Sequence, residues 1–358
     1  MSLDKSINYL EELSRALNFG GKSGALDRRT LFHFLGKVPT MPIINENSIS
    51  RGSVTEFDGV KISSLSWNAG WGKETEAFLL TPTNAQGPLP GVLYLHSHDD
   101  LKEFGKEKVA QKSAEQLPER AQWVSRNHYG NRAPANELAK MGFAVLVHDC
   151  FPWGSRGFSI EELPPRVKEI HGKSSREEFE NLSVMFESLA LNKYLSLYGA
   201  TMAGILNHDD RVALEVAKCL PEITGPISAI GLSGGGCRAI FLHATNPELR
   251  AVVSTGAMAT YRSMLQEHIA PHSWMFFPFD LASAGEWPEV AMISSTPLFV
   301  QYCGNDQLFT KEGMADAHHM LENHDGGAGN YKGEFYPVQH SFTVEMQIAA
   351  FDWLRAHV

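Results

Sequence analysis

The stretch ISAIGLSGGG, residues 227–236, decides how this chain is organised. Its first part is short and mostly apolar, as a buried strand is, and residues 237–244 continue as a helix. Gly231 and Gly235 stand two residues before and after Ser233, which gives the pattern Gly-x-Ser-x-Gly. A tight turn from a strand into a helix crowds those two positions, and glycine has no Cβ to clash there. We therefore expect a sharp turn at Ser233 and a helix that begins near Gly234.

Such a turn raises the hydroxyl of Ser233 above the sheet, where it can act as a nucleophile. The N–H of Gly234 then lies at the start of a helix, where backbone donors are unpaired and the helix dipole is positive. A second N–H donor for a developing oxyanion is expected at about His98, in the loop after a strand over 91–95. A phosphate-binding loop is the poorer interpretation, because no Gly-Lys-Ser or Gly-Lys-Thr follows.

A serine hydroxyl is a weak nucleophile that needs a base, and the base needs an acid to orient it. Asp306 follows an apolar strand expected over 298–302, and His340 follows a strand expected over 331–336 and precedes the last helix. This is the chain order of serine, acid and histidine that accompanies such a turn. Asp280 and Asp325 are the rival acids. We expect Asp306 to orient His340 and His340 to take the proton of Ser233.

The elements around these residues predict an α/β fold with a mostly parallel, doubly wound sheet. From about residue 90 onward, short strands that are apolar on both faces alternate with helices. Before them, Asp58-Gly59 is a hairpin signal between two further strands. We expect a helical extension over residues 1–50 and one main domain over 51–358. Strands are expected over 53–57, 60–67, 76–80, 91–95, 143–147, 227–232 and 251–255, and helices over 176–219, 311–323 and 342–356.

Three segments of the main domain are too long for simple connections, namely 99–133, 150–175 and 257–295. Loops longer than about 12–15 residues usually carry function or extra structure. Each segment follows a strand, so each lies at the carboxyl edge of the sheet, where open α/β sheets bind ligands. We expect these inserted cap segments to shape a pocket. The candidate substrate-binding side chains are His96, Arg132, Trp153, Arg156 and Trp274; the alternative is that such aromatic residues only pack the insertions and that the arginines form structural ion pairs.

The composition limits the partners of this protein. Its 358 residues include 41 acidic and 31 basic side chains, a formal net charge of −10. That balance disfavours nucleic acid and anionic membrane surfaces, which require clustered positive charge. No apolar run approaches the roughly 20 residues that span a bilayer. The four cysteines are scattered, which suits a reducing compartment. We expect a cytoplasmic protein that uses no cofactor or metal and binds a small molecule; whether it forms a homo-oligomer stays open.

With these motifs the sequence resembles the α/β-hydrolase superfamily, and within it the dienelactone hydrolase-like and acetyl xylan esterase-like group. The resemblance covers roughly residues 75–358. It rests on the segments LYLHSH, ELAKMGFAVLVHDCFPWGSRG, GLSGGG, PLFVQYCGNDQLF and QHSF. After the second strand such proteins carry an aspartate and a Phe-Gly-x-Arg-like turn, and here Asp149, Phe151, Gly154 and Arg156 match that pattern.

The resemblance implies a serine hydrolase that cleaves a carboxylic ester of a small molecule through an acyl-enzyme. Two departures bear on this reading. Dienelactone hydrolases use a cysteine where this chain has Ser233, which favours ordinary ester hydrolysis. The oxyanion loop of such proteins usually reads His-Gly-x, whereas this chain has His96-Ser97-His98.

Other functions stay open at this point. His96, His98 and Asp100 partly match the HxHxDH zinc loop of metallo-β-lactamase-like hydrolases, although Leu101 replaces the last histidine. A metal-dependent hydrolase is therefore one alternative. The same fold also hosts enzymes that cleave C–C or C–N bonds and members without catalysis. The cluster at residues 208–210, His-Asp-Asp, is expected to lie on a solvated helix face.

Overall fold

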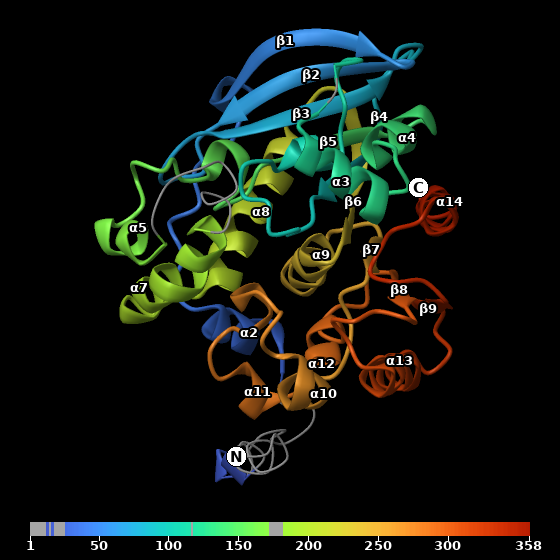
Figure 1. Cartoon of the computed structure of the whole chain (residues 1–358). Helices are drawn as coiled ribbons and strands as arrows, with labels where there is room; N and C mark the ends of the chain where they lie inside the picture. Colours follow the sequence, from blue (N-terminus) through green and yellow to red (C-terminus); the bar gives the residue numbers. More distant parts are fainter. Residues whose placement is uncertain (1–11, 14–15, 18–25, 116, 172–181) are drawn as a thin grey trace.

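The computed structural model describes residues 12–13, 16–17, 26–115, 117–171 and 182–358. In this part of the chain one nine-stranded sheet has the order β1-β2-β3-β5-β4-β6-β7-β8-β9 (Figure 1). The first three strands form an antiparallel meander, β3 pairs antiparallel with β5, and all neighbours from β5 to β9 are parallel. The strands are β1 Ile49–Phe57, β2 Val60–Trp67, β3 Thr75–Pro82, β4 Leu89–Leu95, β5 Ala144–His148, β6 Ile223–Leu232, β7 Val252–Thr255, β8 Leu298–Cys303 and β9 Tyr331–Tyr336.

Helices cover both faces of the sheet, which confirms the doubly wound α/β class. Successive side chains of a strand point to opposite faces. In β4, Val92 and Tyr94 pack into one core with helices α3 Glu119–His128, α4 Pro134–Lys140 and α14 Val344–Arg355. Leu93 and Leu95 pack into the other core with α2 Arg28–Leu35, α8 Met202–Lys218, α9 Gly234–Thr245, α12 Trp287–Ala291 and α13 Lys311–Asp325. Figure 1 shows α8 and α9 on one side of the sheet and α4 and α14 on the other.

Side-chain caps begin several of these helices. The first turn of a helix leaves backbone N–H groups without partners, and a preceding Asp or Thr oxygen can accept from one of them. Asp27 accepts from the N–H of Thr30 at 2.7 Å, which starts α2. Thr201 accepts from the N–H of Gly204 at 2.9 Å, and Thr310 caps α13 in the same way. These residues explain why the helices begin where they do.

The expected helical extension over residues 1–50 is only partly helical where it is described. Leu31, Phe34 and Leu35 are buried on α2, as their spacing predicts. The carbonyl of Leu35 accepts from the hydroxyl of Thr201 at 2.7 Å, so α2 is fixed to α8. Residues 37–45 are not helical, and β1 begins at residue 49, so the extension runs directly into the sheet. The expected helix around Leu10 lies outside the described residues.

The three long segments contain short helices. The first, 99–133, holds a 3-10 turn at Lys106–Lys108 and α3. The second, 150–175, holds a 3-10 turn at Gly154–Arg156 and α5 Pro165–His171. The third, 257–295, holds α10 Tyr261–Ser263, π-helical Met264–His268, a 3-10 turn at Trp274–Phe276, α11 Leu281–Ala284 and α12.

The region expected to be helical over about 176–219 is largely helical where the structure describes it, but it is divided by a turn. π-helical Glu187–Leu191 and α7 Asn192–Leu197 are separated from α8 by a turn. Gly199 has a φ of +71° in that turn, a conformation that favours glycine and ends a helix. Across the described ranges, no helix combines the length and the apolar character needed to cross a membrane.

Candidate active site

The turn at Ser233 has the strained geometry that the glycine pattern predicts. β6 ends at Leu232, Ser233 has a φ of +57° and a ψ of −120°, and α9 begins at Gly234. A positive φ at a residue with a Cβ is unfavourable and persists only where the surroundings hold it. Here the N–H of Ser233 donates to the carbonyl of Thr255 on β7 at 2.8 Å. The neighbouring strand therefore stabilises the turn that presents the serine.

The glycines on either side of Ser233 are required by close backbone contacts. A Cβ at Gly231 would lie 2.3 Å from the carbonyl carbon of Gly235. A Cβ at Gly235 would lie 2.1 Å from the carbonyl oxygen of Leu95, at the end of β4. Real Cβ atoms do not approach backbone this closely, so α9 can start against β4 only with glycine at these positions.

The structure brings Asp306 and His340 together beside Ser233. Asp306 follows β8 and His340 lies between β9 and α14, and Nδ1 of His340 is 2.6 Å from Oδ2 of Asp306. The other oxygen of Asp306 accepts from the N–H of Leu308 at 2.8 Å, which fixes the carboxylate. The rival acids are engaged locally: Asp280 accepts from the hydroxyl of Ser283, and Asp325 accepts from backbone N–H groups in the turn after α13.

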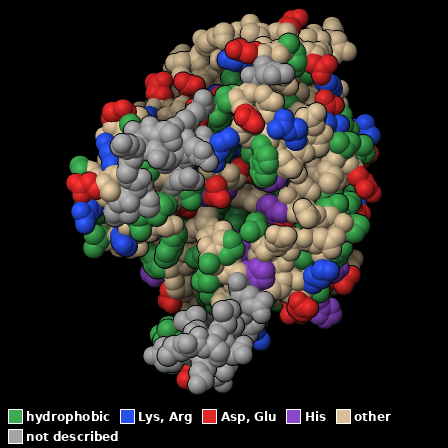
Figure 2. Space-filling model, in the orientation of Figure 1, with side chains coloured by type: hydrophobic (Ala, Val, Ile, Leu, Met, Phe, Trp, Pro, Cys, Tyr) green, Lys and Arg blue, Asp and Glu red, His purple; other side chains and the backbone are tan. Residues whose placement is uncertain are grey.

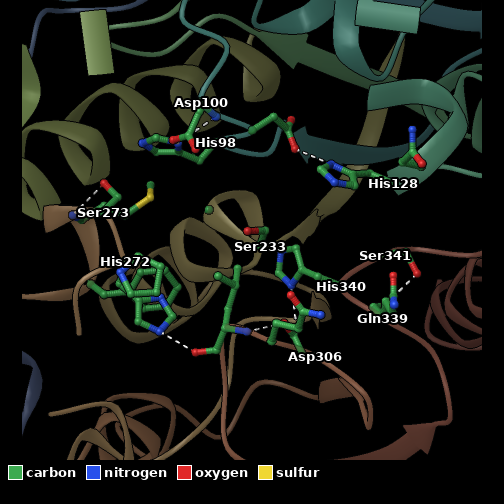
Figure 3. A pocket seen from close by; sticks show the side chains of 18 of the residues that line it. His98, Asp100, His128, Ser233, His272, Ser273, Asp306, Gln339, His340 and Ser341 are labelled. Carbon is green, nitrogen blue, oxygen red and sulfur yellow. Dashed lines mark hydrogen bonds and ion pairs between the residues drawn. The ribbon is translucent and has the colours of Figure 1, made fainter. Parts of the chain in front are cut away.

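These three side chains line one pocket of about 790 Å³. Its walls come from the loop after β4, from α3, from residues 271–276 and from the loops after β8 and β9. Figure 2 shows the surface hollowed near its centre with histidine side chains beside the hollow, and Figure 3 shows Ser233 next to His340, which contacts Asp306. The first and third inserted segments therefore shape the pocket, whereas no described residue of 150–175 lines it.

The loop after β4 brings a backbone N–H to the start of α9. A Cβ built on Gly234 would lie 3.1 Å from the backbone nitrogen of His98, so the two predicted oxyanion donors are neighbours. The peptide unit that carries this N–H is held at its carbonyl, since the carbonyl of Ser97 accepts from Nζ of Lys108 at 2.9 Å. The carbonyl of His98 also accepts from Nζ of Lys108, at 2.9 Å, and from Nε1 of Trp153 at 3.1 Å. Trp153 is thus buried under the loop and does not line this pocket, although a contact with substrate was expected of it.

The imidazole of His98 is engaged in a buried ion network. Its Nε2 lies 3.3 Å from Oε2 of Glu187 and 3.1 Å from Nζ of Lys102, which also donates to Glu187. Burial alone would raise the pKa of Glu187, but attraction to Lys102 and His98 outweighs burial and holds that pKa well below its ordinary value. Glu187 also accepts from the hydroxyl of Ser273, so the network joins two walls of the pocket.

None of the other candidate substrate-binding residues lines this pocket. Nε2 of His96 lies 3.5 Å from Sγ of Cys150, and burial lowers the pKa of this histidine well below its ordinary value. The guanidinium of Arg156 contacts Asp209 and donates to the carbonyl of Trp71 at 2.9 Å, and Nε of Arg132 donates to Gln347 at 2.7 Å. These side chains are structural partners. Trp274 borders two neighbouring cavities instead.

The donors of the alternative metal site do not converge. The imidazoles of His96 and His98 face different partners, Cys150 and Glu187, and the carboxylate of Asp100 is largely exposed beside Nδ1 of His98 at 3.1 Å. A metal ion needs at least three donors at short range around one point. Within the described ranges, no group of three or more His, Cys, Asp or Glu side chains meets that condition.

A buried charge cluster on α8 was also not found from the sequence. His208, Asp209 and Asp210 are buried on α8, so their expected place on a solvated face is wrong. Asp210 binds the guanidinium of Arg238 on α9, with Oδ2 to Nε at 3.0 Å, and Arg238 donates to the carbonyl of His96 at 3.2 Å. The available signal was that these charges interrupt an otherwise apolar helix, because charges in such a position require buried partners.

A further pair that was not found from the sequence lies in the pocket itself. Nδ1 of His128, the last residue of α3, lies 2.7 Å from Oδ1 of Asp99. Asp99 and Asp100 both have positive φ, +54° and +52°, which marks the loop after β4 as strained. Two consecutive aspartates after a strand could have predicted an unusual turn. The contact with His128 could not be predicted, because that residue lies 29 positions further along the chain.

Comparison with known proteins agrees with this architecture. No family model matches the chain. The "Putative hydrolase YtaP" of Bacillus subtilis is 22% identical over 290 residues, which cover 80% of this chain and 83% of that protein.

Two solved structures are similar along most of the chain. A "putative acetyl xylan esterase" of Bacteroides fragilis superposes with a TM-score of 0.62 at 15% identity, over 94% of this chain and 77% of that one. The glucuronoyl esterase of Solibacter usitatus gives a TM-score of 0.62 at 12% identity, over 95% of this chain and 96% of that one. Together with the parallel sheet and the turn at Ser233, these likenesses show that the chain has the α/β-hydrolase fold.

Proposed function

We propose that this protein is a serine hydrolase that cleaves a carboxylic ester of a small molecule through an acyl-enzyme. The observation that carries the proposal is the 2.6 Å contact between Asp306 and His340 in the pocket that Ser233 also lines. A serine on a strained turn, a histidine and a buried carboxylate are the parts that nucleophilic acyl transfer needs. The similar structures named as esterases support the same class of reaction.

In the acylation step the hydroxyl oxygen of Ser233 attacks the ester carbon while Nε2 of neutral His340 takes the hydroxyl proton. Asp306 accepts from Nδ1–H of His340, which keeps Nε2 free as the base and stabilises the imidazolium that forms. The tetrahedral intermediate collapses, the bond to the alcohol oxygen breaks, and His340 returns the proton to that oxygen. The alcohol leaves and the acyl group stays on Ser233.

Water completes the cycle by the reverse sequence. His340 takes a proton from water as it attacks the acyl carbon, and then gives the proton back to Ser233 as the acid departs. In both steps the negative oxygen would be bound by the N–H groups of Gly234 and His98. Removing one such donor in an enzyme of this type typically costs about 10²–10³-fold in kcat.

The decisive experiment is covalent labelling with a fluorophosphonate, which reacts with an activated serine. We expect one label on the peptide that contains Ser233 and none in Ser233→Ala, which should lose at least about 10³-fold in kcat on short p-nitrophenyl esters while its melting temperature is kept. A screen of acetyl, longer acyl, lactone and amide substrates would then define the acyl group. If Ser233→Ala keeps its esterase activity, the proposed function is refuted.

The same assay separates the alternatives. A metal-dependent hydrolase would lose activity with a chelator and resist the fluorophosphonate. An enzyme that cleaves C–C or C–N bonds would be labelled at Ser233 but would hydrolyse none of the esters in the screen. A protein of this fold without catalysis would not be labelled. The divergent directions of His96 and His98 favour the serine mechanism over the metal one.

A further inference from the structure

A second histidine–carboxylate pair faces the candidate active site. His128 contacts Asp99 through Nδ1 at 2.7 Å, as His340 contacts Asp306 through Nδ1 at 2.6 Å. The two imidazole rings lie 6.1 Å apart between centroids and are nearly perpendicular, at 86°. Both side chains line the pocket and are labelled in Figure 3 on the same side of Ser233. The reaction proposed above uses His340 and leaves His128 without a role.

The surroundings of Asp99 stabilise the ionised form of its carboxylate. Its carboxylate is 2% exposed, its Oδ2 lies 3.6 Å from Nζ of Lys108, and the hydroxyl of Ser97 donates to it. Burial alone would raise the pKa of Asp99, but attraction to Lys108 and the hydrogen bond with His128 outweigh it and hold that pKa well below its ordinary value. An ionised carboxylate can only accept hydrogen bonds, so the hydrogen of this contact sits on Nδ1 of His128.

That tautomer decides what His128 can bind. With hydrogen on Nδ1, Nε2 of the neutral ring carries a lone pair and accepts a hydrogen bond. The carbonyl of His128 accepts from the N–H of Phe342 at 2.7 Å, and the ring of Trp123 packs against the imidazole at 5.1 Å. The ring is therefore held in place at the pocket wall. It presents an acceptor, which suits an O–H group.

The location indicates which half of the substrate carries that O–H group. In an ester bound for the proposed reaction, the carbonyl oxygen lies toward Gly234 and His98, and the alcohol oxygen lies toward His340, which must protonate it. His128 is the ring beside His340, so it lies next to the alcohol half. We propose that His128 binds a hydroxyl group of the alcohol half, one or two carbons from the leaving oxygen, with Asp99 as the residue that positions it. This inference rests on the proposed function and adds to it a residue that selects the alcohol half of the ester.

The test compares glycerol monoacetate with propyl acetate, which share the acyl group and the length of the alcohol chain and differ in hydroxyl groups. The measured quantity is the ratio of the two kcat/KM values. We expect the protein to favour glycerol monoacetate and His128→Phe to lower that ratio about 5- to 10-fold, the usual effect of one neutral hydrogen bond. Arg126→Ala, an exposed change on the same helix, is the matched control and should leave the ratio as it is.

The ratio distinguishes binding from a structural defect, because a distorted pocket lowers both values together. Should His128→Phe fail to fold, His128→Asn repeats the test, since its amide nitrogen can still donate to Asp99 from the position of Nδ1 while no acceptor stands at the position of Nε2; the ratio should fall there too. An equal loss on both esters, or an unchanged ratio, overturns the inference. A loss confined to acetoxyacetate, an ester whose alcohol half carries a carboxylate, does so as well and would identify an anion site. If Ser233 is not labelled by fluorophosphonate, the proposed function itself has failed.

Discussion

The ammonium group of Lys108 lies 2.9 Å from the carbonyl oxygen of His98, the residue whose backbone nitrogen lies beside Gly234. Lys108 also donates to the carbonyl of Ser97 at 2.9 Å, and its side chain is fully buried. The carbonyl of Ser97 belongs to the same planar peptide unit as the N–H of His98, so its contact with Lys108 fixes the orientation of that N–H. A lysine 10 and 11 residues further along the chain thus fixes the two carbonyls of this loop.

We predict that Lys108→Met lowers kcat about 10-fold or more with little change in KM, because the N–H of His98 loses its orientation and oxyanion binding acts in the transition state. Steady-state kinetics on a short ester measures both constants. Lys112→Met, at an exposed lysine nearby, is the control. A Lys108→Met protein that folds and keeps its kcat would show that the loop does not need this cation.

Asp306→Asn should lower kcat by about 10³–10⁴-fold while the fold is kept. An amide in place of the carboxylate can direct N–H toward His340 and stabilise the wrong tautomer, in which Nε2 is no longer a base. Asp280→Asn is the matched control, because Asp280 was one of the two rival acids and its carboxylate accepts from the hydroxyl of Ser283. Near-normal activity of Asp306→Asn would place the orienting acid elsewhere.

Gly235→Ala should lower the free energy of unfolding by about 1–3 kcal/mol or more and lower activity with it. The new Cβ would lie 2.1 Å from the carbonyl oxygen of Leu95, so α9 has to move away from β4. Gly87→Ala is the control, because a Cβ there meets nothing within 4 Å. Denaturant unfolding of the two variants measures the difference; equal stabilities would mean that the turn relaxes freely.

Stability should fall between pH 6.5 and pH 4 through buried histidines. Burial lowers the pKa of His243 to about 4, against a weaker opposite effect of its hydrogen bond to the carbonyl of Ala291. The unfolded chain binds this proton at higher pH than the folded one, so the contribution is complete above pH 6.5 and is lost as pH falls through 4. It amounts to roughly 3 kcal/mol.

His243→Gln should therefore flatten the decline in unfolding free energy measured in urea at pH 7, 6 and 5. His272 contributes in the same direction, since burial lowers its pKa to about 4 as well, so some slope remains. His319→Gln, at an exposed histidine, should keep the full slope. If the slopes of the two variants agree, His243 is not the group that titrates.

The local sequence pattern predicted the bounds of several strands of the sheet. The strands expected over 60–67 and 331–336 have those bounds in the structure, and the hairpin at Asp58-Gly59 joins β1 to β2. Those segments have clear alternation or apolar character, and their ends are marked by turn residues. β1 begins at residue 49 rather than 53, because this edge strand is largely exposed and carries no hydrophobic pattern.

What the sequence by itself determined is the turn at Ser233 and the order of serine, acid and histidine, because these depend on steric limits and on chain order. Only the tertiary structure decided which side chains surround them. Asp99 meets His128 across 29 residues, Lys102 meets Glu187 across 85 and Arg132 meets Gln347 across 215. Contacts of that kind form where separate elements pack against one sheet. The spacing of residues along the chain does not predict such contacts. For this reason Arg132, Trp153 and Arg156, expected at the substrate, have structural partners instead, and the pair of His128 and Asp99 was found only in the structure.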